Sequence, residues 1–143
     1  MDEYLISNTI NPAYSLVREG RYEEAKQKIG PLLIEEQVLA YFMGKCARTD
    51  AHMLAWMIDQ AGDWMRKPME TTPELTMADQ MFMIACGSGL LDCVKVMMEK
   101  CEVHVDASFN GRQQEPLSDA CSSGNAEVVR YLLERGASPN VGH

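Results

Sequence analysis

The stretch at residues 115–140, EPLSDACSSGNAEVVRYLLERGASPN, constrains the fold of this chain more than any other. Pro116 predicts the first turn of a helix, because its fixed φ suits that position and its missing N–H is not needed there. Gly124 predicts a left-handed turn, and Asn125 is a typical N-cap for a second helix that ends near Gly136. The apolar stripe of that second helix consists of Val128, Val129, Leu132 and Leu133. Two short helices joined this tightly cannot bury both of their apolar faces, so other helices must stack on them.

A similar pattern occurs earlier in the chain, at residues 79–105, DQMFMIACGSGLLDCVKVMMEKCEVHV. A shift of 35 residues aligns Gly89 with Gly124, and it also brings Ala-Cys onto Ala-Cys and Met-Met onto Leu-Leu. Cys101 stands where the later stretch has Gly136, so we expect this helix to end without a left-handed turn. Repeats of this length are typical of solenoid proteins.

Two weaker units come before this pair of stretches. Residues 35–61 contain two apolar helical stretches without a glycine between them, and Asp50 is the expected N-cap of the second. Residues 11–34 contain two shorter stretches separated by Gly20. Residues 62–78 contain two prolines and are expected to form an enlarged finger loop, with a short helical turn as one option, and such loops in a compact domain are often functional.

The stretch at 115–140 closely resembles an ankyrin repeat. The pattern of that family runs roughly TPLHxAAxxGHxEVVxLLLxxGADxN, and the letters PL, A, G, EVV, LL, GA and N fall in register here. The departures from the pattern are Glu115, Ser118, Cys121, Asn125 and Ser138. The resemblance implies an all-α ankyrin-repeat solenoid of about four stacked helix pairs with finger loops, built as a single domain over residues 1–143. Its units would be 11–34, 35–61, 79–105 and 115–140, with 62–78 as an enlarged finger loop.

The first unit, residues 11–34, has two interpretations. It resembles a divergent ankyrin repeat at the start of the stack, and its G-R-Y-E-E-A sequence also resembles a tetratricopeptide repeat, whose helix pair has a similar turn. Residues 1–10 are expected to be a lead-in or a fraying first turn. Both interpretations predict a helix pair.

Charge and composition exclude several classes of protein. A formal net charge of −8 is incompatible with the basic face that nucleic-acid binding needs. No run of about 18 apolar residues is present, and the N-terminal sequence lacks the pattern of a secretory signal. Five cysteines, an odd number without framework spacing, suit a reducing compartment. We therefore expect a monomeric intracellular protein of the cytoplasm or nucleus that binds neither nucleic acid nor membrane.

The cysteines and histidines give one candidate chemical site. Cys86, Cys93, Cys101 and His104 lie within nineteen residues, but there is no CxxC pair of the kind that zinc sites favour. The helical register places Cys86 and Cys93 on buried faces, which favours packing, and makes Cys101 the thiol expected to be most exposed. The alternative is a thiol-based metal or redox sensor built from Cys93, Cys101 and His104. Since no phosphate loop, nucleophile elbow or dinucleotide fingerprint is present, we expect no catalysis and no cofactor.

The resemblance also implies where a partner binds, because proteins of this family usually contact partners through a concave face made by finger loops and first helices. Trp64 and Phe109 are the expected anchors, since loop aromatics are common at the centre of interfaces. Arg48, Arg66 and Arg112 are expected to pair with carboxylates of the partner. The complete expected set is Arg18, Arg48, Trp64, Met65, Arg66, Ser88, Phe109, Asn110, Arg112, Gln114, Ser122 and Ser123.

These features predict a non-catalytic protein–protein interaction module or scaffold that binds an intracellular protein. One alternative is a targeting segment of a larger protein, enzymes included. Asp119 supports a natural end of the stack, because it stands where the family usually has an apolar residue that faces the next repeat. Pro139 and Asn140 support continuation, because they resemble the lead into another repeat.

Overall fold

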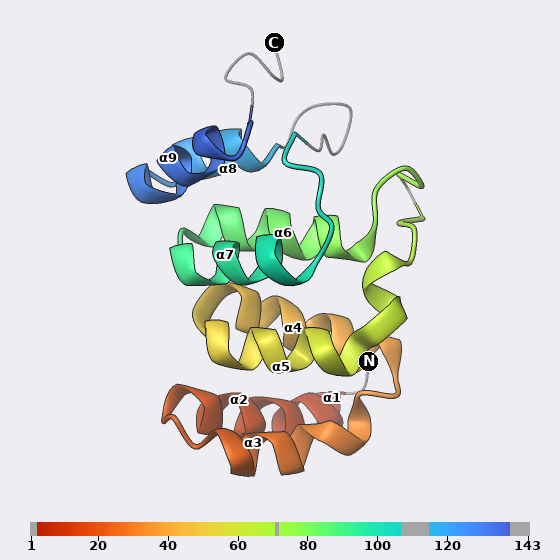
Figure 1. Ribbon diagram of the computed structural model, residues 1–143. Coiled ribbons are helices and arrows are strands. Elements are labelled where there is room, and N and C mark those ends of the chain that lie inside the picture. The colour runs from red at the N-terminus through yellow and green to blue at the C-terminus, as the bar shows by residue number, and fades with distance from the viewer. Residues whose placement is uncertain (1–2, 71, 107–114, 138–143) are drawn as a thin grey trace.

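In the computed structural model, which describes residues 3–70, 72–106 and 115–137, the chain is a stack of helix pairs (Figure 1). The pairs are α2 (Asn11–Arg18) with α3 (Tyr22–Ile29), α4 (Glu36–Thr49) with α5 (Ala51–Ala61), α6 (Met77–Ser88) with α7 (Leu91–Lys100), and α8 (Pro116–Ser122) with α9 (Ala126–Glu134). Within the described ranges the only strand pairing is an isolated bridge between Pro68 and Thr76. The expected all-α solenoid of stacked helix pairs is confirmed.

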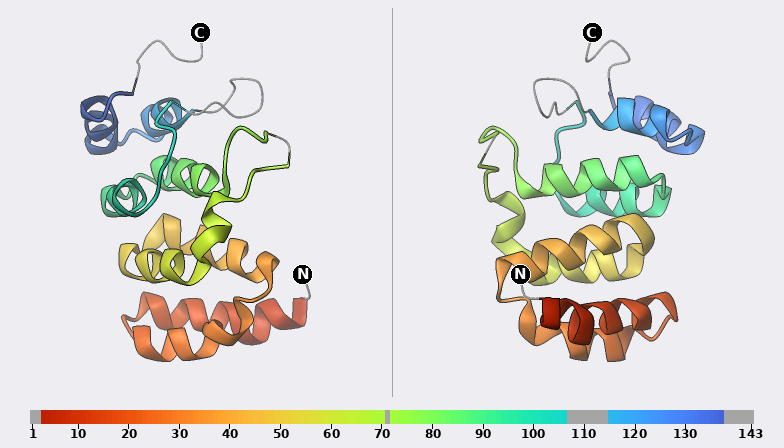
Figure 2. Two further views of the ribbon diagram at one scale, coloured as in Figure 1. Left: turned by 45° about the vertical axis from the view of Figure 1, so that its right-hand side comes forward. Right: turned by 180° about the vertical axis from the view of Figure 1, so that it is seen from behind.

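The helices form two layers. The second helices of the pairs, α3, α5 and α7, lie in front in Figure 1, and the first helices come to the front when the molecule is seen from behind (Figure 2). In the layer of first helices, α4 packs against α6 and α6 against α8. In the layer of second helices, α5 packs against α7 and α7 against α9. We call the exposed surface of the first helices the inner face and that of the second helices the outer face.

Glycine ends two of the helices at the expected places. Gly124 has a φ of 74° and Gly136 a φ of 100°, values that other residues rarely adopt. At the end of α9, the N–H of Ala137 donates to the carbonyl of Leu132, and the N–H of Gly136 donates to the carbonyl of Leu133. These bonds satisfy two carbonyls that the helix leaves without a partner, so the turn is closed by local chemistry.

Two other helix ends close without a left-handed residue. Asp50 alone joins α4 to α5, and its Oδ1 accepts the N–H of Met53 at 2.9 Å, which confirms the expected N-cap. Cys101 ends α7 in an extended conformation with a φ of −131°, also as expected. Asn125 is the N-cap residue of α9 as expected, although its side chain makes no capping hydrogen bond. Its amide lies beside Gly89 of the preceding pair instead.

The N-terminal residues are part of the stack. The short helix α1 (Glu3–Leu5) and the π-helical segment η1 (Ile6–Ile10) run directly into α2, and Ile10 is fully buried. The N–H of Asn11 donates to the carbonyl of Ile6, five residues back, and Pro12 has no N–H to continue the usual ladder. The expectation of a lead-in at 1–10 is wrong for the described residues, because η1 packs against α3.

The connection between α5 and α6 is only partly a loop. The 3₁₀ helix η3 (Gly62–Arg66) continues from α5, and α6 starts at Met77, inside the expected loop. Thr76 and Asp79 form a capping box, in which Asp79 Oδ2 accepts the N–H of Thr76 at 2.9 Å. The bridge between Pro68 and Thr76 closes the base of the part that remains a loop. We call its described residues, 67–70 and 72–76, the finger.

The first helix pair is attached to the second by aromatic side chains with polar ends. The ring of Tyr14 meets the edge of Phe42 with 6.5 Å between centroids, and its hydroxyl donates to Thr49 Oγ1 at 2.8 Å. The hydroxyl of Tyr22 donates to Asp50 Oδ2 at 2.9 Å, which raises the pKa of Tyr22. Large side chains therefore span the space between these two pairs.

Candidate protein-binding surface

The inner face carries a groove between α4 and α6. The groove has two halves. The turn half, near the turns between paired helices, has a volume of about 330 Å³, and the finger half, beside the finger, has a volume of about 310 Å³. The turn half is lined by Ala40, Tyr41, Gly44, Lys45, Arg48, Gln80, Met81 and Ile84. The finger half is lined by Glu36, Gln37, Ala40, Trp64, Lys67, Pro68, Met69, Glu70, Met77 and Gln80. Because both halves share Ala40 and Gln80, they form one continuous surface, which we call the inner groove.

Small residues on α4 make the floor of the inner groove. One side of α4 is buried, with Val38, Leu39, Phe42, Met43, Cys46 and Ala47 in the core. Gly44 is buried too, at the edge of this side next to the half-buried Ala40, and a Cβ placed on Gly44 would stand 3.8 Å from Ile84 Cδ1. Tyr41, which is 36% exposed, forms a wall beside this floor. The groove exists because α4 lacks large side chains where Ala40 and Gly44 face α6.

The turn end of the inner groove is positively charged. The ammonium of Lys45 lies 4.8 Å from the ring centroid of Tyr14 and 5.3 Å from that of Tyr41. Arg48 lies one turn further along α4 and is exposed. Among the residues that the structure describes, neither cation forms an ion pair. Aromatic rings position Lys45 without neutralising it.

At the finger end of the inner groove, an ion pair attaches the finger to α4, and Glu70 adds a further carboxylate to the lining. The ammonium of Lys67 lies 2.6 Å from Glu36 Oε1, which joins the finger to the first turn of α4. The hydrogen bond and charge of Lys67 lower the pKa of Glu36, and a hydrogen bond from Trp64 adds to the effect. Trp64 is half-buried against this junction, with Met69 and Met77 beside it.

The structure brings two of the expected partner-binding residues together. Arg48 and Trp64 both line the inner groove, one in each half. The others are dispersed or not described. Arg18, Ser88, Ser122 and Ser123 are exposed near the turns, outside both halves of the groove. Phe109, Asn110, Arg112 and Gln114 lie outside the described residues.

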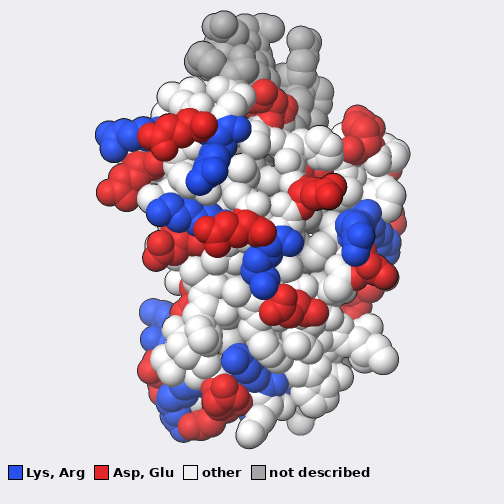
Figure 3. Space-filling view, viewed as in Figure 1, with Lys and Arg blue, Asp and Glu red and all other residues white. Residues whose placement is uncertain are grey.

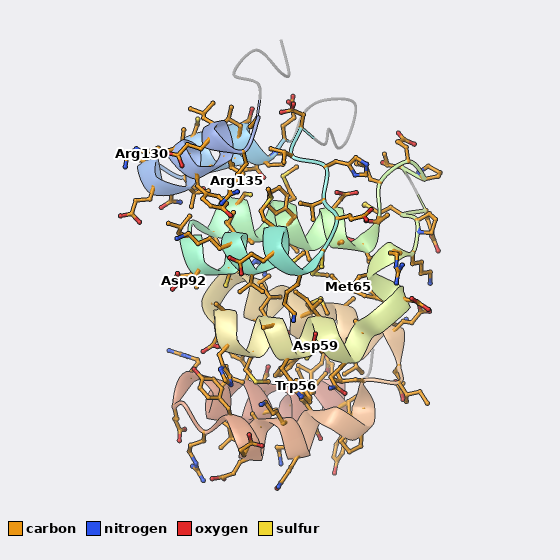
Figure 4. All side chains as sticks on the ribbon, in the orientation of Figure 1. Trp56, Asp59, Met65, Asp92, Arg130 and Arg135 are labelled. Carbon is orange, nitrogen blue, oxygen red and sulfur yellow. The ribbon has the colours of Figure 1, made fainter. Side chains whose placement is uncertain are left out.

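Two residues of the expected set lie elsewhere for clear physical reasons. Met65 is only 4% exposed, because η3 turns it toward the core, so the expectation that it contacts a partner is wrong (Figure 4). Arg66 is exposed but forms an ion pair with Asp63 at 2.9 Å and lines a cavity of the outer face.

Tyr41 and Lys45 are the main residues of the inner groove that sequence reasoning missed. Their place opposite the buried stripe of α4 was the signal that could have revealed them.

The outer face holds a larger cavity of about 650 Å³ at the ends of α5 and α7. It brings Cys101 and His104 together, and the Nδ1 of His104 lies 2.8 Å from Asp79 Oδ2. Both Arg66 and Lys100 in its lining are paired, Arg66 with Asp63 and Lys100 with Asp59 at 3.0 Å. Figure 3 shows acidic and basic side chains interspersed over this face. The cavity therefore has no excess of one charge to select a ligand.

Four of the thiols, Cys46, Cys86, Cys93 and Cys101, are poor nucleophiles because burial raises their pKa. Burial raises the pKa of Cys93 to about 12. Cys101 is half-buried with a raised pKa, whereas Cys121 is exposed. The expectation that Cys101 is the most exposed thiol is therefore wrong. Cys93 donates to the carbonyl of Cys46 within the core and is remote from the outer cavity's lining. In residues 3–70, 72–106 and 115–137, no three potential metal ligands come together.

The last helix pair differs from expectation in the direction of Asp119. A Cβ placed on Gly87 of α6 would stand 3.6 Å from Asp119 Oδ2, so this carboxylate faces the preceding pair, not a following one. Burial raises the pKa of Asp119. On the far side, Leu133 is 43% exposed and lines a shallow hollow together with Val129.

Comparisons with known proteins agree with the fold. A family model of ankyrin repeats in three copies matches residues 43–143. No curated protein and no solved structure is significantly similar to the chain. Within the described ranges, no helix has the length and apolar character needed to cross a membrane. The family match covers well over half of the chain, and we conclude that the chain belongs to the ankyrin-repeat family, whose repeats generally serve as protein–protein interaction modules.

Proposed function

We propose that the chain is a non-catalytic module that binds an intracellular protein through the inner groove and the finger beside it. The observation that carries this proposal is the continuous groove between α4 and α6, which combines an apolar floor with exposed cations. Protein interfaces concentrate their binding energy around aromatic and arginine side chains at apolar pockets. Tyr41, Arg48 and Trp64 provide such side chains here.

The rigidity of the groove supports this function. Helices α4 and α6 pack directly against each other, and the ion pair between Lys67 and Glu36 holds the finger against α4. A surface that is ordered before binding loses less conformational entropy when a partner docks. A monomeric chain of this kind would present the inner groove without rearrangement.

Affinity capture tests the proposed function. The wild-type chain and a Tyr41→Ala, Arg48→Ala variant would be used to capture proteins from native cell extract, followed by mass spectrometry. A Lys28→Ala, Arg130→Ala variant is the matched control, because both residues are exposed on the outer helices α3 and α9. Circular dichroism would establish that all three are folded. We expect a protein that wild type and control retain and the groove variant loses, and equal recovery by all three would place the contact elsewhere.

One observation favours a second candidate, a targeting segment within a larger protein. Leu133 and Val129 leave an apolar hollow on the far side of the last helix pair, of the kind that another helix pair would cover. An antibody against the chain would show the size of the endogenous protein on an immunoblot. A band far above the size expected for 143 residues supports this candidate, and a band at that size contradicts it.

A further inference from the structure

The turn half of the inner groove has a charge opposite to that of the whole chain. The chain has a formal net charge of −8, yet no carboxylate lines this half. Lys45 and Arg48 are both part of its lining. An acidic protein that keeps two cations together in a groove, with no carboxylate beside them, offers a local site for negative charge.

Only some of the other cations form ion pairs with carboxylates of this chain, namely Arg21, Lys26, Arg66, Lys67 and Lys100. Among the described residues, Arg18, Lys28, Lys95, Arg130 and Arg135 form none. What distinguishes Lys45 and Arg48 is that they stand together in a groove half whose lining holds no carboxylate. Lys45 lies between the rings of Tyr14 and Tyr41, which hold its ammonium in place and leave its charge uncompensated. Arg48 follows three residues later, so the Cα atoms of Lys45 and Arg48 stand roughly 5 Å apart along the axis of α4.

An apolar floor adjoins these charges. Ala40 and Gly44 on α4 face Met81 and Ile84 on α6, and Tyr41 forms a wall beside them. Between these walls the part of the floor that α4 supplies carries no side chain larger than the methyl group of Ala40, which leaves room for one apolar side chain. A polyanion such as a nucleic acid would gain nothing from such a floor, whereas a peptide with mixed side chains would.

We propose that the inner groove takes an acidic peptide segment of the protein partner. One apolar side chain of the segment lies over Gly44, and neighbouring carboxylates bind Lys45 and Arg48. The lining of α4 from Gln37 to Arg48 covers roughly 16 Å, which matches about five extended residues or three turns of helix. This inference rests on the proposed function and specifies the chemistry of the partner.

Selection from a random peptide library displayed on phage tests the inference. Peptides selected on the wild-type chain would be measured individually against a Lys45→Glu, Arg48→Glu variant. A Lys28→Glu, Arg130→Glu variant is the control, since it makes the same change of net charge on the outer helices. The neutral pair Lys45→Gln, Arg48→Gln replaces the reversed pair if the latter does not fold. A third variant, Gly44→Leu, fills the floor of the groove.

We expect selected peptides that combine Asp or Glu with a large apolar residue. Their affinity should fall at least about tenfold on the Lys45→Glu, Arg48→Glu variant, because two charge contacts become repulsive, and should stay unchanged on the control. It should also fall on Gly44→Leu and weaken with added salt.

The other outcomes separate this inference from the proposed function. Peptides that need the floor of the groove but lack acidic residues and tolerate charge reversal would overturn the acidic segment and leave protein binding intact. Displacement of the peptides by polyadenylate at equal charge concentration would point to a general polyanion site and also overturn it. Peptides that bind all variants equally, or no selected peptide, would contradict both the inference and the proposed function.

Discussion

Asp79 is the most constrained polar residue among those described. It is fully buried at the start of α6, where its carboxylate accepts the N–H of Thr76 and binds both the N–H and the Nδ1 of His104 at 2.7 and 2.8 Å. One side chain thereby caps α6 and fastens the segment that follows α7. Buried polar groups of this kind are costly to leave without partners.

We predict that Asp79→Ala lowers the free energy of unfolding by about 3 kcal/mol, from the loss of a helix cap and of hydrogen bonds to a buried carboxylate. Urea unfolding followed by circular dichroism would measure it. His104→Ala should cost clearly less, because it leaves the cap intact and its side chain is largely exposed. A loss below about 0.5 kcal/mol for Asp79→Ala would show that neither contact contributes.

The thiols provide a second prediction at this scale. In the native chain at pH 8, a thiol reagent such as dithionitrobenzoate should label Cys121 rapidly and Cys101 more slowly. Cys46, Cys86 and Cys93 should react only after unfolding, because burial raises the pKa of each and the thiolate is the reactive form. Mass spectrometry of digested protein identifies the labelled sites. Rapid native labelling of Cys93 would contradict the packing and revive a redox role.

At this scale, the residues that cap helices and form turns could be predicted from the sequence. Asp50 and the turn glycines follow from hydrogen bonds within a few residues, and the sequence predicted them. The N-cap position of Asn125 was predicted correctly, but the direction of its side chain and that of Asp119 were not, because the two side chains lie against Gly89 and Gly87 of the preceding helix pair. A repeat pattern describes one unit and says little about which side chains of the next unit it meets.

At the scale of elements, the turn of one helix pair packs closely on the next. Gly89 ends α6 with a φ of 81°, and a Cβ at this position would overlap the amide of Asn125 at the start of α9. Only glycine meets both requirements, the left-handed backbone and the close approach. This contact sets how the last helix pair sits on the third.

We predict that Gly89→Ala lowers the free energy of unfolding by about 1 kcal/mol for the left-handed backbone and by a further amount for the overlap with Asn125. In a Gly89→Ala, Asn125→Ala double variant, the overlap is removed and only the backbone cost remains. The double variant should therefore be less destabilised than the sum of the two single variants. Additive effects in urea unfolding would show that the two residues do not touch in solution.

The connecting elements were the least predictable. Residues 62–78 were expected to be one loop with at most a short helical turn, yet α6 begins at Met77 and Met65 of the 3₁₀ helix enters the core. Similarly, η1 extends the first helix backwards from Pro12 through a π turn. Both segments are stabilised by contacts with distant helices, which no local pattern reports.

At the scale of the whole molecule, the turn half of the inner groove differs in charge from the outer face. The outer face mixes acids and bases, many of them paired, whereas the turn half of the inner groove holds Lys45 and Arg48 with no carboxylate in its lining. The fold was predictable because stacking follows from repeated apolar stripes. The inner groove was only partly predictable, since it needs α4 and α6 side by side in a definite register. Arg48 and Trp64 were expected, and Tyr41 and Lys45 were not.

Site-specific photo-crosslinking tests the central claim most directly, because it reports which face a partner touches. A benzophenone amino acid would replace Tyr41 in the inner groove and, in a separate chain, Lys95 on the exposed side of α7. Each chain would be irradiated in native cell extract after its fold is checked by circular dichroism. The account predicts a discrete adduct with a protein from position 41 that is absent from position 95. Adducts from position 95 alone, or none from position 41, would contradict binding through the inner groove.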